Sequence, residues 1–316
     1  MKNLVLAILT FLILGDLEAI FYINFQDSDS ESKFFKNDYG QKNPGTIPTL
    51  FSPSYIRTEH RIHSSPVFSP DMNEVYWSVF PRGSNIEHKY ETILYARKVE
   101  NRWSLPEVAN FSGEYTDGGP FFSPDGKKLY FYSKRPLKNK TKEETNGEIW
   151  FVEKHSNSWS APQHIELNHK GEKLFFSLSN NNTIYFTSGH GYGGTGIGSV
   201  DIYYARFIGG SYQKPEKLPD EINSKNFVES DPLISPDEKY IIYYSMERPE
   251  NIGQYDLYIS HNLNNKRWTK PINLGKEINK GYSRFPRFSP DGNYVFFVRQ
   301  DGVYWVDSSV IHNYNK

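Results

Sequence analysis

The stretch Phe-Ser-Pro-Asp-Gly-Lys-Lys-Leu-Tyr-Phe at residues 122–131 decides the fold, because pieces of it recur along the chain. The proline of this motif stands at positions 70, 124, 236 and 290. A degenerate copy, Phe-Ser-Leu-Ser-Asn at 176–180, adds position 178, so the spacings are 54, 54, 58 and 54 residues. A fixed period of this length is the signature of a repeat architecture.

The Ser-Pro-Asp-Gly portion predicts a tight turn in each repeat. Proline presets φ for the second position of a type I turn, and glycine accepts the left-handed conformation that follows. We therefore interpret Asp125 and its equivalents as turn formers rather than catalytic acids. Met72 and Glu238 replace the glycine in two copies, so those two turns should be more strained or slightly different.

The residues after each turn predict four short strands per repeat. Tyr, Phe and Trp, which favour strands, make up 16% of the chain. In the second repeat the strand-like runs are 129–131 and 149–152, followed by Trp-Ser-Ala-Pro at 159–162, where proline indicates an edge strand. Four antiparallel strands, named a to d from the innermost outward, form one blade of a β-propeller when the unit is repeated.

The number of repeats predicts an all-β propeller with five blades of four antiparallel strands. The slots for the innermost strand are Pro66, Pro120, Leu174, Pro232 and Pro286. A ring of six blades, the alternative, would need a unit that the sequence does not show. The last unit ends after strand c, and residues 47–51 precede the first strand a as Pro106 precedes the second. We expect this N-terminal segment to complete the last blade and to remove an open sheet edge.

The motif at 122–131, together with Asp-Ile-Tyr at 201–203, resembles the WD40-like repeat called PD40, which occurs in TolB-like propellers of bacteria. The resemblance covers about residues 44–308, and we assign residues 44–312 to a single propeller domain. It implies an exported or periplasmic protein that acts mostly as a binding scaffold. The resemblance is specific for the fold rather than for one function, because propellers host many activities.

The N-terminus predicts export. Lys2 precedes an apolar run at 4–14, and Ala19 is a small residue at a plausible cleavage point, which together indicate a signal peptide over residues 1–19. The run is shorter than the roughly 20 residues that span a bilayer, although the apolar residues 20–25 leave an uncleaved anchor open. We expect residues 20–43 to form a flexible leader and the protein to be periplasmic or secreted, with no stable membrane span after cleavage.

Composition narrows the partners and the chemistry. Lys plus Arg is 36 and Asp plus Glu is 37, and this balance argues against a nucleic-acid binder. The absence of Cys excludes disulfides, thiolate metal sites and a cysteine nucleophile. We expect no cofactor and no metal: His60, His63 and His190 hint at a metal site, but their spacing matches no known ligand motif. We also expect a monomer.

Loop lengths predict a ligand site on one face of the ring. The d–a and b–c connections are long, whereas the a–b and c–d turns are short, and loops on a rigid scaffold carry binding residues. The candidates lie just before strand a or soon after strand b, around the mouth of the central channel. They are His63, Arg82, Asp117, Arg135, Glu172, Lys173, Glu229, Asp231, Arg248, Tyr282 and Arg284. The alternative interpretation of each is a solvated strand end or a local ion pair, and Tyr282 would suit sugar stacking.

These patterns predict a non-catalytic exported propeller that binds an envelope protein, a peptide or a glycan at this face. The alternative is a carbohydrate-active lyase or hydrolase with its site at the channel mouth. Two carboxyl groups about 5–10 Å apart in a cleft would suit glycoside hydrolysis, and three converging histidines would suit a metal. A third possibility, a purely structural envelope module, predicts a broad apolar patch on an outer face.

Overall fold

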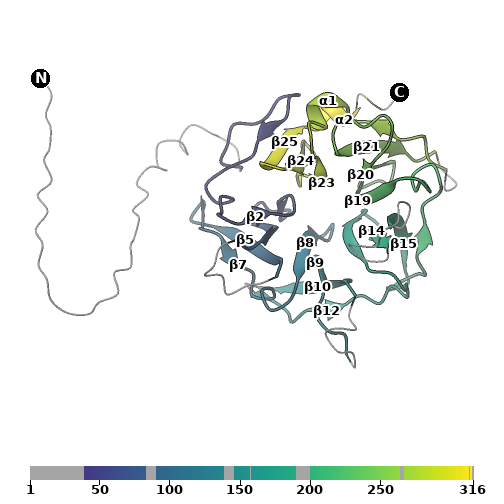
Figure 1. Cartoon of the computed structure of the whole chain (residues 1–316). Coiled ribbons are helices and arrows are strands. Elements are labelled where there is room, and N and C mark those ends of the chain that lie inside the picture. The colour runs from purple at the N-terminus through teal and green to yellow at the C-terminus, as the bar shows by residue number, and fades with distance from the viewer. Residues whose placement is uncertain are drawn as a thin grey trace, which may run out of the picture. The chain divides into compact units, whose positions relative to one another are not determined.

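The computed structural model describes residues 39–82, 90–138, 146–156, 158–189, 200–263, 267–312 and 314. These residues form five antiparallel blades around a common centre, a β-propeller (Figure 1). The predicted all-β fold with five blades is therefore confirmed, and the alternative of six blades is wrong. The innermost strands, among them β8, β19 and β23, converge on the centre of the ring.

Each of the first three blades carries additional two-residue strands beside its main strands. Blade 1 contains β2 (Arg61–Ile62), β3 (Val67–Phe68), β4 (Glu74–Phe80), β5 (Thr92–Val99), β6 (Arg102–Trp103) and β7 (Glu107–Val108). Blade 2 contains β8 (Asp117–Phe122), β9 (Lys128–Ser133), β10 (Glu148–His155), β11 (Ser158–Trp159) and β12 (Gln163–His164). Blade 3 contains β13 (Leu174–Leu178), β14 (Ile184–Gly189), β15 (Val200–Ala205), β16 (Phe207–Ile208), β17 (Ser211–Tyr212) and β18 (Glu216–Lys217).

The last two blades are simpler, and each is followed by a single helical turn. Blade 4 contains β19 (Val228–Ile234), β20 (Tyr240–Met246), β21 (Tyr255–His261) and β22 (Ile272–Asn273), followed by α1 (Gly275–Ile278). Blade 5 contains β23 (Arg284–Phe288), β24 (Tyr294–Arg299) and β25 (Gly302–Asp307), with β1 (Thr49–Leu50) paired to β25 and α2 (Ser309–His312) following.

The outermost strand of each blade begins after the proline rather than at it. In blade 1 the Trp103 segment pairs with the end of β5 as a hairpin, and β7 then pairs with the middle of β5. Blade 2 repeats this arrangement with β11 and β12. Because proline cannot donate a ladder hydrogen bond, it stands between the hairpin and the edge strand.

The Ser-Pro-Asp-Gly segments form the predicted turns. Ser123 Oγ donates a hydrogen bond of 2.6 Å to Asp125 Oδ1, which also accepts one of 3.1 Å from the Lys127 backbone N–H. The bond from Ser123 is the main reason why the pKa of the Asp125 carboxyl lies below its usual value. The same serine-to-aspartate bond recurs at Asp71, Asp237 and Asp291. The interpretation of these aspartates as turn formers is thus confirmed.

Blade 3 uses a turn two residues later than the sequence motif suggests. Ser179 Oγ donates to Asn181 Oδ1 at 2.8 Å, and Asn182 has φ +63°, close to the +68° of Gly126. The proline slot of this blade is therefore position 180 rather than 178, and the spacings become 54, 56, 56 and 54 residues. The motif search failed here because Phe176 and Ser177 happen to match the start of the repeat.

Alanine at two of the turn glycines should separate backbone strain from steric contact. Gly292 has φ +72° with open space at its Cβ position, so Gly292→Ala should cost about 1 kcal/mol for the left-handed backbone alone. A Cβ on Gly126 would also lie 2.9 Å from Pro70, so Gly126→Ala should cost about 2 kcal/mol. Urea unfolding measures both, and equal losses would contradict the steric contribution.

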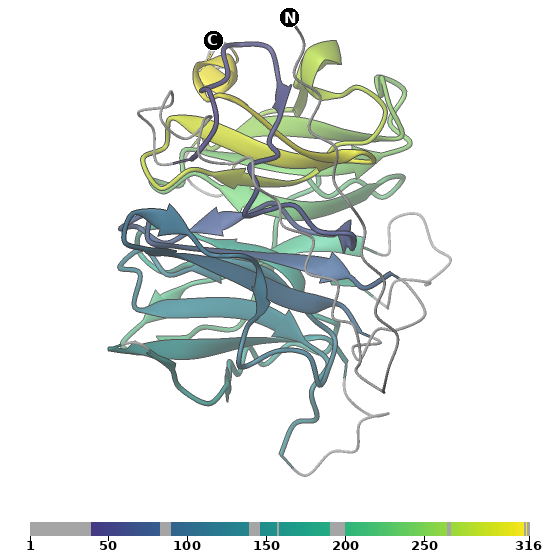
Figure 2. The same cartoon turned by 90° about the vertical axis from the view of Figure 1, so that its left-hand side faces the viewer.

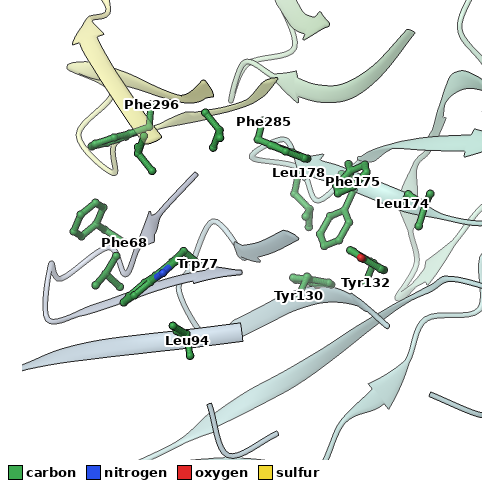
Figure 3. Packing of buried hydrophobic residues seen from close by; sticks show 14 of the residues in the cluster. Phe68, Trp77, Leu94, Tyr130, Tyr132, Leu174, Phe175, Leu178, Phe285 and Phe296 are labelled. Carbon is green, nitrogen blue, oxygen red and sulfur yellow. The ribbon is translucent and has the colours of Figure 1, made fainter. Parts of the chain in front are cut away.

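A β-bulge interrupts the innermost strand of four blades. The pairing register shifts in β8, β13, β19 and β23, where a residue with positive φ sits: Gly119, Phe175, Asp231 and Phe285. The rings of Phe175 and Phe285 meet at 4.9 Å, and both side chains are buried (Figure 3). The bulges thus turn side chains from different blades toward each other at the centre.

Both ends of the folded chain meet in blade 5. Strand β1 pairs antiparallel with β25, with Thr49 opposite Trp305 and Leu50 opposite Tyr304; Figure 2 shows β1 beside these C-terminal strands. Phe51 follows β1 and packs with ring centroids 5.0 Å from both Trp305 and Phe296. Tyr39, within the predicted flexible leader, is also buried and lies 5.4 Å from Trp305. The packed chain therefore includes Tyr39, before the predicted domain start at residue 44.

The contribution of this N-terminal segment can be measured at two adjacent residues. Phe51 is 2% exposed, so Phe51→Ala should lower the free energy of unfolding by about 3–5 kcal/mol. Leu50 is 45% exposed, and Leu50→Ala should change it by about 0.5 kcal/mol. Urea denaturation gives both values. Equal small losses would mean that the segment after β1 does not hold the last blade to the first.

Candidate functional site

A cleft of about 800 Å³ lies where blade 5 meets blade 1, and we call it the seam cleft. One wall is formed by ten of the residues between Leu50 and His63, and the other by residues 298–303, which are the adjoining ends of β24 and β25 with their turn. Arg82 after β4, Gln254 before β21, Gly281 and Tyr282 before β23, and Phe285 within β23 also line it. The cleft is thus built from d–a and b–c connections, the kinds of loop in which the sequence analysis places a ligand site. His63, Arg82 and Tyr282 of the predicted residues line it.

Positively charged side chains outnumber carboxylates in the lining of the seam cleft. Four arginines line it, namely Arg57, Arg61, Arg82 and Arg299, against one lining carboxylate, Asp301. Arg299 is held by the carbonyl oxygen of Ile278 at 3.2 Å and by the Tyr304 ring at 4.2 Å. Within the described ranges, no carboxylate forms an ion pair with Arg57, Arg61 or Arg82. The cleft is therefore suited to an anionic group.

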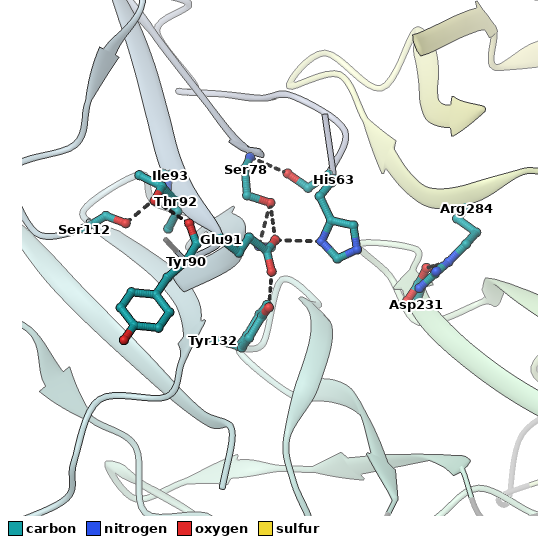
Figure 4. A network of polar contacts seen from close by, with 12 residues as sticks. His63, Ser78, Tyr90, Glu91, Thr92, Ile93, Ser112, Tyr132, Asp231 and Arg284 are labelled. Carbon is teal, nitrogen blue, oxygen red and sulfur yellow. Dashed lines mark hydrogen bonds and ion pairs between the residues drawn. The ribbon is translucent and has the colours of Figure 1, made fainter. Parts of the chain in front are cut away.

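His63 is held in place by a buried carboxylate behind the cleft. His63 Nδ1 lies 2.8 Å from Glu91 Oε1, which also accepts a 2.7 Å hydrogen bond from Ser78 Oγ (Figure 4). Tyr132 of blade 2 donates to the second oxygen of Glu91. A Cβ at Gly118 would collide with this carboxylate, so glycine is needed there for space. This arrangement directs Nδ1 of His63 toward Glu91 and leaves Nε2 for another partner.

Four of the predicted residues form ion pairs inside single blades. Asp117 pairs with Arg135 at 2.8 Å in blade 2, and Glu229 pairs with Arg248 at 2.7 Å in blade 4. In both cases the arginine Nε donates to the serine at the end of strand b, and both carboxylates have fully buried side chains. The repetition in two blades indicates that these pairs brace the fold, rather than facing a ligand.

Asp231 and Arg284 link neighbouring blades at the centre. Arg284 Nε lies 3.2 Å from Asp231 Oδ2 (Figure 4), and the Arg284 guanidinium lies 4.4 Å from the Phe285 ring. Both side chains are buried, as is Phe175, whose ring lies 5.8 Å from the Arg284 guanidinium. At this part of the predicted channel mouth, the two residues therefore form a buried ion pair beside aromatic rings.

Lys173 lines a second, smaller cleft of about 650 Å³ between blades 2 and 3, whereas Glu172 is not among its lining residues. Lys173 donates to Glu148 at 2.9 Å, while Glu172 pairs with Lys134 at 3.4 Å. His169, another lining residue, has its Nε2 2.7 Å from Ser188 Oγ. The equivalent serines of blades 2 and 4, Ser133 and Ser245, accept hydrogen bonds from arginines, so a polar partner for the serine at this position recurs among the blades.

The predicted site residues thus separate into cleft residues and structural pairs. The sequence analysis missed Arg57 and Arg61 because it placed the first strand a at the Pro66 slot. In the structure an earlier short strand, β2, already pairs Arg61 with Phe80 of β4. It also missed Glu91, which ends a connection and carries no motif. His190 lies outside the described residues. Across the described part of the chain, no group of three or more His, Asp or Glu residues could hold a metal.

The comparisons with known proteins establish the fold alone. No family model and no curated protein matches the chain. Among solved structures, a "Glycoside hydrolase" and a BT0996 complex with RGII each align with a TM-score of 0.52 at 10% identity, over 84% of this chain and 91% or 92% of theirs. A protein of unknown function from Dyadobacter fermentans aligns with a TM-score of 0.50 at 10% identity, over 84% and 83%. This chain is therefore a β-propeller protein similar in fold to these proteins.

The contribution of the Glu229–Arg248 ion pair of blade 4 to the free energy of unfolding should depend on pH. Burial raises the pKa of Glu229 from its ordinary 4.5 to about 7, and Arg248 limits the rise. The folded carboxyl thus holds its proton more tightly than the unfolded one. The stability that this tighter proton binding contributes is fully present below pH 4.5 and is lost as the pH rises through about 7.

Arg248→Met should lower the free energy of unfolding by about 3–5 kcal/mol above pH 7, because it leaves a buried carboxylate unpaired. The loss should shrink toward pH 5, where Glu229 is protonated. Urea unfolding across this range tests the expectation, with the exposed Arg97→Met as the matched control. A large loss that does not change with pH would contradict it.

Proposed function

We propose that the protein is an exported, non-catalytic β-propeller that binds an anionic ligand in the seam cleft. Of the protein, peptide and glycan ligands that the sequence analysis leaves open, we favour an acidic glycan. The observation that carries the proposal is the group of Arg57, Arg61 and Arg82 in a cleft whose described lining contains one carboxylate. Elsewhere on this face, Arg135, Arg248 and Arg284 are each paired with a buried acid.

The chemistry of the lining fits a sugar that carries carboxylate or sulfate groups. Guanidinium groups bind such anions through two parallel hydrogen bonds. Tyr282 and the apolar Ile62 supply surfaces on which a sugar ring packs, and Gln254 and Gln300 supply amide groups for hydroxyls. The formal charge of the whole chain is −1, so the positive character of the cleft is local and would attract an anion selectively.

Export is supported by the N-terminal sequence and by the PD40 resemblance, which rests on motifs alone. Residues 1–19 have the pattern of a signal peptide and lie outside the described residues. No helix in the described segments is long and apolar enough to cross a membrane. A periplasmic or secreted location would bring the cleft into contact with envelope or extracellular glycans.

A carbohydrate-active enzyme is the second candidate, and His63 is the observation that favours it. Its Nδ1 is held by Glu91 while its ring borders the cleft, which is the arrangement of a positioned general base. The described lining contains Asp301 as its one carboxylate, so it does not provide the pair that glycoside hydrolysis uses. A lyase with His63 as the base is therefore the form of enzyme that suits this site.

Affinity electrophoresis in gels containing polygalacturonate, heparin or neutral dextran tests the proposal. The intact protein should be retarded by an acidic glycan and not by dextran, and Arg61→Gln/Arg82→Gln should weaken binding at least about tenfold, or roughly 1.4 kcal/mol. Arg97→Gln/Arg102→Gln, with two exposed arginines outside the cleft, is the matched control. Equal retardation of both double variants would refute the proposed site.

Long incubation of the protein with the same glycans distinguishes binding from catalysis. A binding protein leaves the glycan intact after long incubation, with or without His63→Gln. If the intact protein shortens the glycan, and His63→Gln is retarded equally but does not shorten it, the protein is a lyase rather than a non-catalytic binding protein.

A further inference from the structure

The innermost strand of blade 5 carries a charge where the other blades carry none. Arg287 of β23 lies opposite Phe296 of β24, and the positions with the equivalent pairing are all uncharged. They are Val67, Phe121, Ser177 and Leu233. The propeller therefore forms this part of the strand without an arginine, and Arg287 is an addition to the fold rather than a requirement of it.

Arg287 is buried close to the central axis. Its exposed fraction is 1%, and its guanidinium lies 5.3 Å from the ring of Phe121, which belongs to blade 2. Asp231 of blade 4 also acts on it electrostatically. A side chain of blade 5 that interacts with both blade 2 and blade 4 must lie where the innermost strands converge.

One of the three nitrogens of the Arg287 guanidinium has a protein acceptor. Nη1 donates to the carbonyl oxygen of Pro286 at 2.9 Å, whereas Nε and Nη2 meet no acceptor among the described residues. The N–H groups of Nε and Nη2 point the same way from one edge of the planar group, which is the edge that binds anions through two hydrogen bonds. The donors without protein acceptors are thus arranged as a single fork.

The positive charge of Arg287 is also not fully balanced by carboxylates among the described residues. Among the described residues, the one carboxylate that acts on Arg287 is Asp231, which already accepts hydrogen bonds from Arg284 at 3.2 Å and from the backbone N–H of Phe285 at 3.3 Å. Two guanidinium groups therefore share one carboxylate. Burial lowers the pKa of Arg287 only to about 10, so the group remains charged at neutral pH.

We propose that the edge of Arg287 formed by Nε and Nη2 is an internal binding site for a small inorganic anion of the size of chloride. An anion supplies both the missing acceptor and the missing negative charge, whereas a neutral water molecule supplies only the first. Without an acceptor and a negative charge nearby, the buried guanidinium would lower the stability of the fold, because unpaired charges and unsatisfied donors are unfavourable in the interior. The enclosed position excludes large organic anions. The site is independent of the seam cleft, which Arg287 does not line.

Thermal unfolding of the full chain in sodium chloride against sodium gluconate, at equal ionic strength and neutral pH, tests the site. Chloride should raise the melting temperature of the intact protein in a saturable way by about 3–6 °C. Arg287→Leu, which copies Leu233 of blade 4, should lose this dependence on chloride. Arg102→Leu, at an exposed arginine of blade 1, is the matched control and should keep it.

Bromide provides a second measurement that does not require the variant to fold. Crystals of the intact protein soaked in sodium bromide should show an anomalous peak within hydrogen-bond distance of Nε and Nη2 of Arg287. An absent peak at this position would overturn the proposal and assign the donors to water. A chloride dependence that is the same in Arg287→Leu as in the intact protein would also overturn it.

Discussion

The antiparallel pairing of β1 with β25 is the contact on which the arrangement of the site depends. Thr49 and Leu50 lie opposite Trp305 and Tyr304, so residues from both ends of the folded chain share one sheet. The segment that leaves β1 runs through residues 51–60 before it enters blade 1 at β2, and it contributes to one wall of the seam cleft. Without the pairing, Arg57 in this connection and Arg61 in β2 would have no fixed position relative to blade 5.

Arginines in this protein fall into three physical situations. Arg135, Arg248 and Arg284 are buried beside carboxylates and stabilise the blades or their contacts. Arg57, Arg61 and Arg82 are exposed in a cleft without a carboxylate partner among the described residues. Arg287 is buried with one edge facing no protein acceptor in the described segments. Since burying an unpaired cation is costly and exposing one is not, only the third situation requires a compensating partner, whereas the second leaves the guanidinium groups accessible to the ligand proposed for the seam cleft.

The sequence predicted the architecture more completely than it predicted the site. Five repeats of the turn motif were enough for the number of blades, because each turn is stabilised by residues close together in the chain, such as Ser123 and Asp125. The search misplaced the turn of blade 3, where asparagines replace the proline, aspartate and glycine. Of the predicted site residues, His63, Arg82 and Tyr282 line the seam cleft, whereas Asp117, Glu229 and Asp231 are buried in ion pairs. Position relative to a strand did not reveal whether a charge had a partner.

What the sequence by itself determined is the repeated blade, since a β-turn and an alternating strand depend on neighbours within a few residues. The tertiary structure alone decided which charges meet. Glu91 and Tyr132 are 41 residues apart, and Arg284 and Asp231 are 53 apart, yet each pair is in contact. Such contacts depend on how the blades are stacked around the axis and on the left-handed bulges that turn side chains inward. No local pattern of residues encodes that geometry, so neither the seam cleft nor the surroundings of Arg287 could be derived before the blades were placed together.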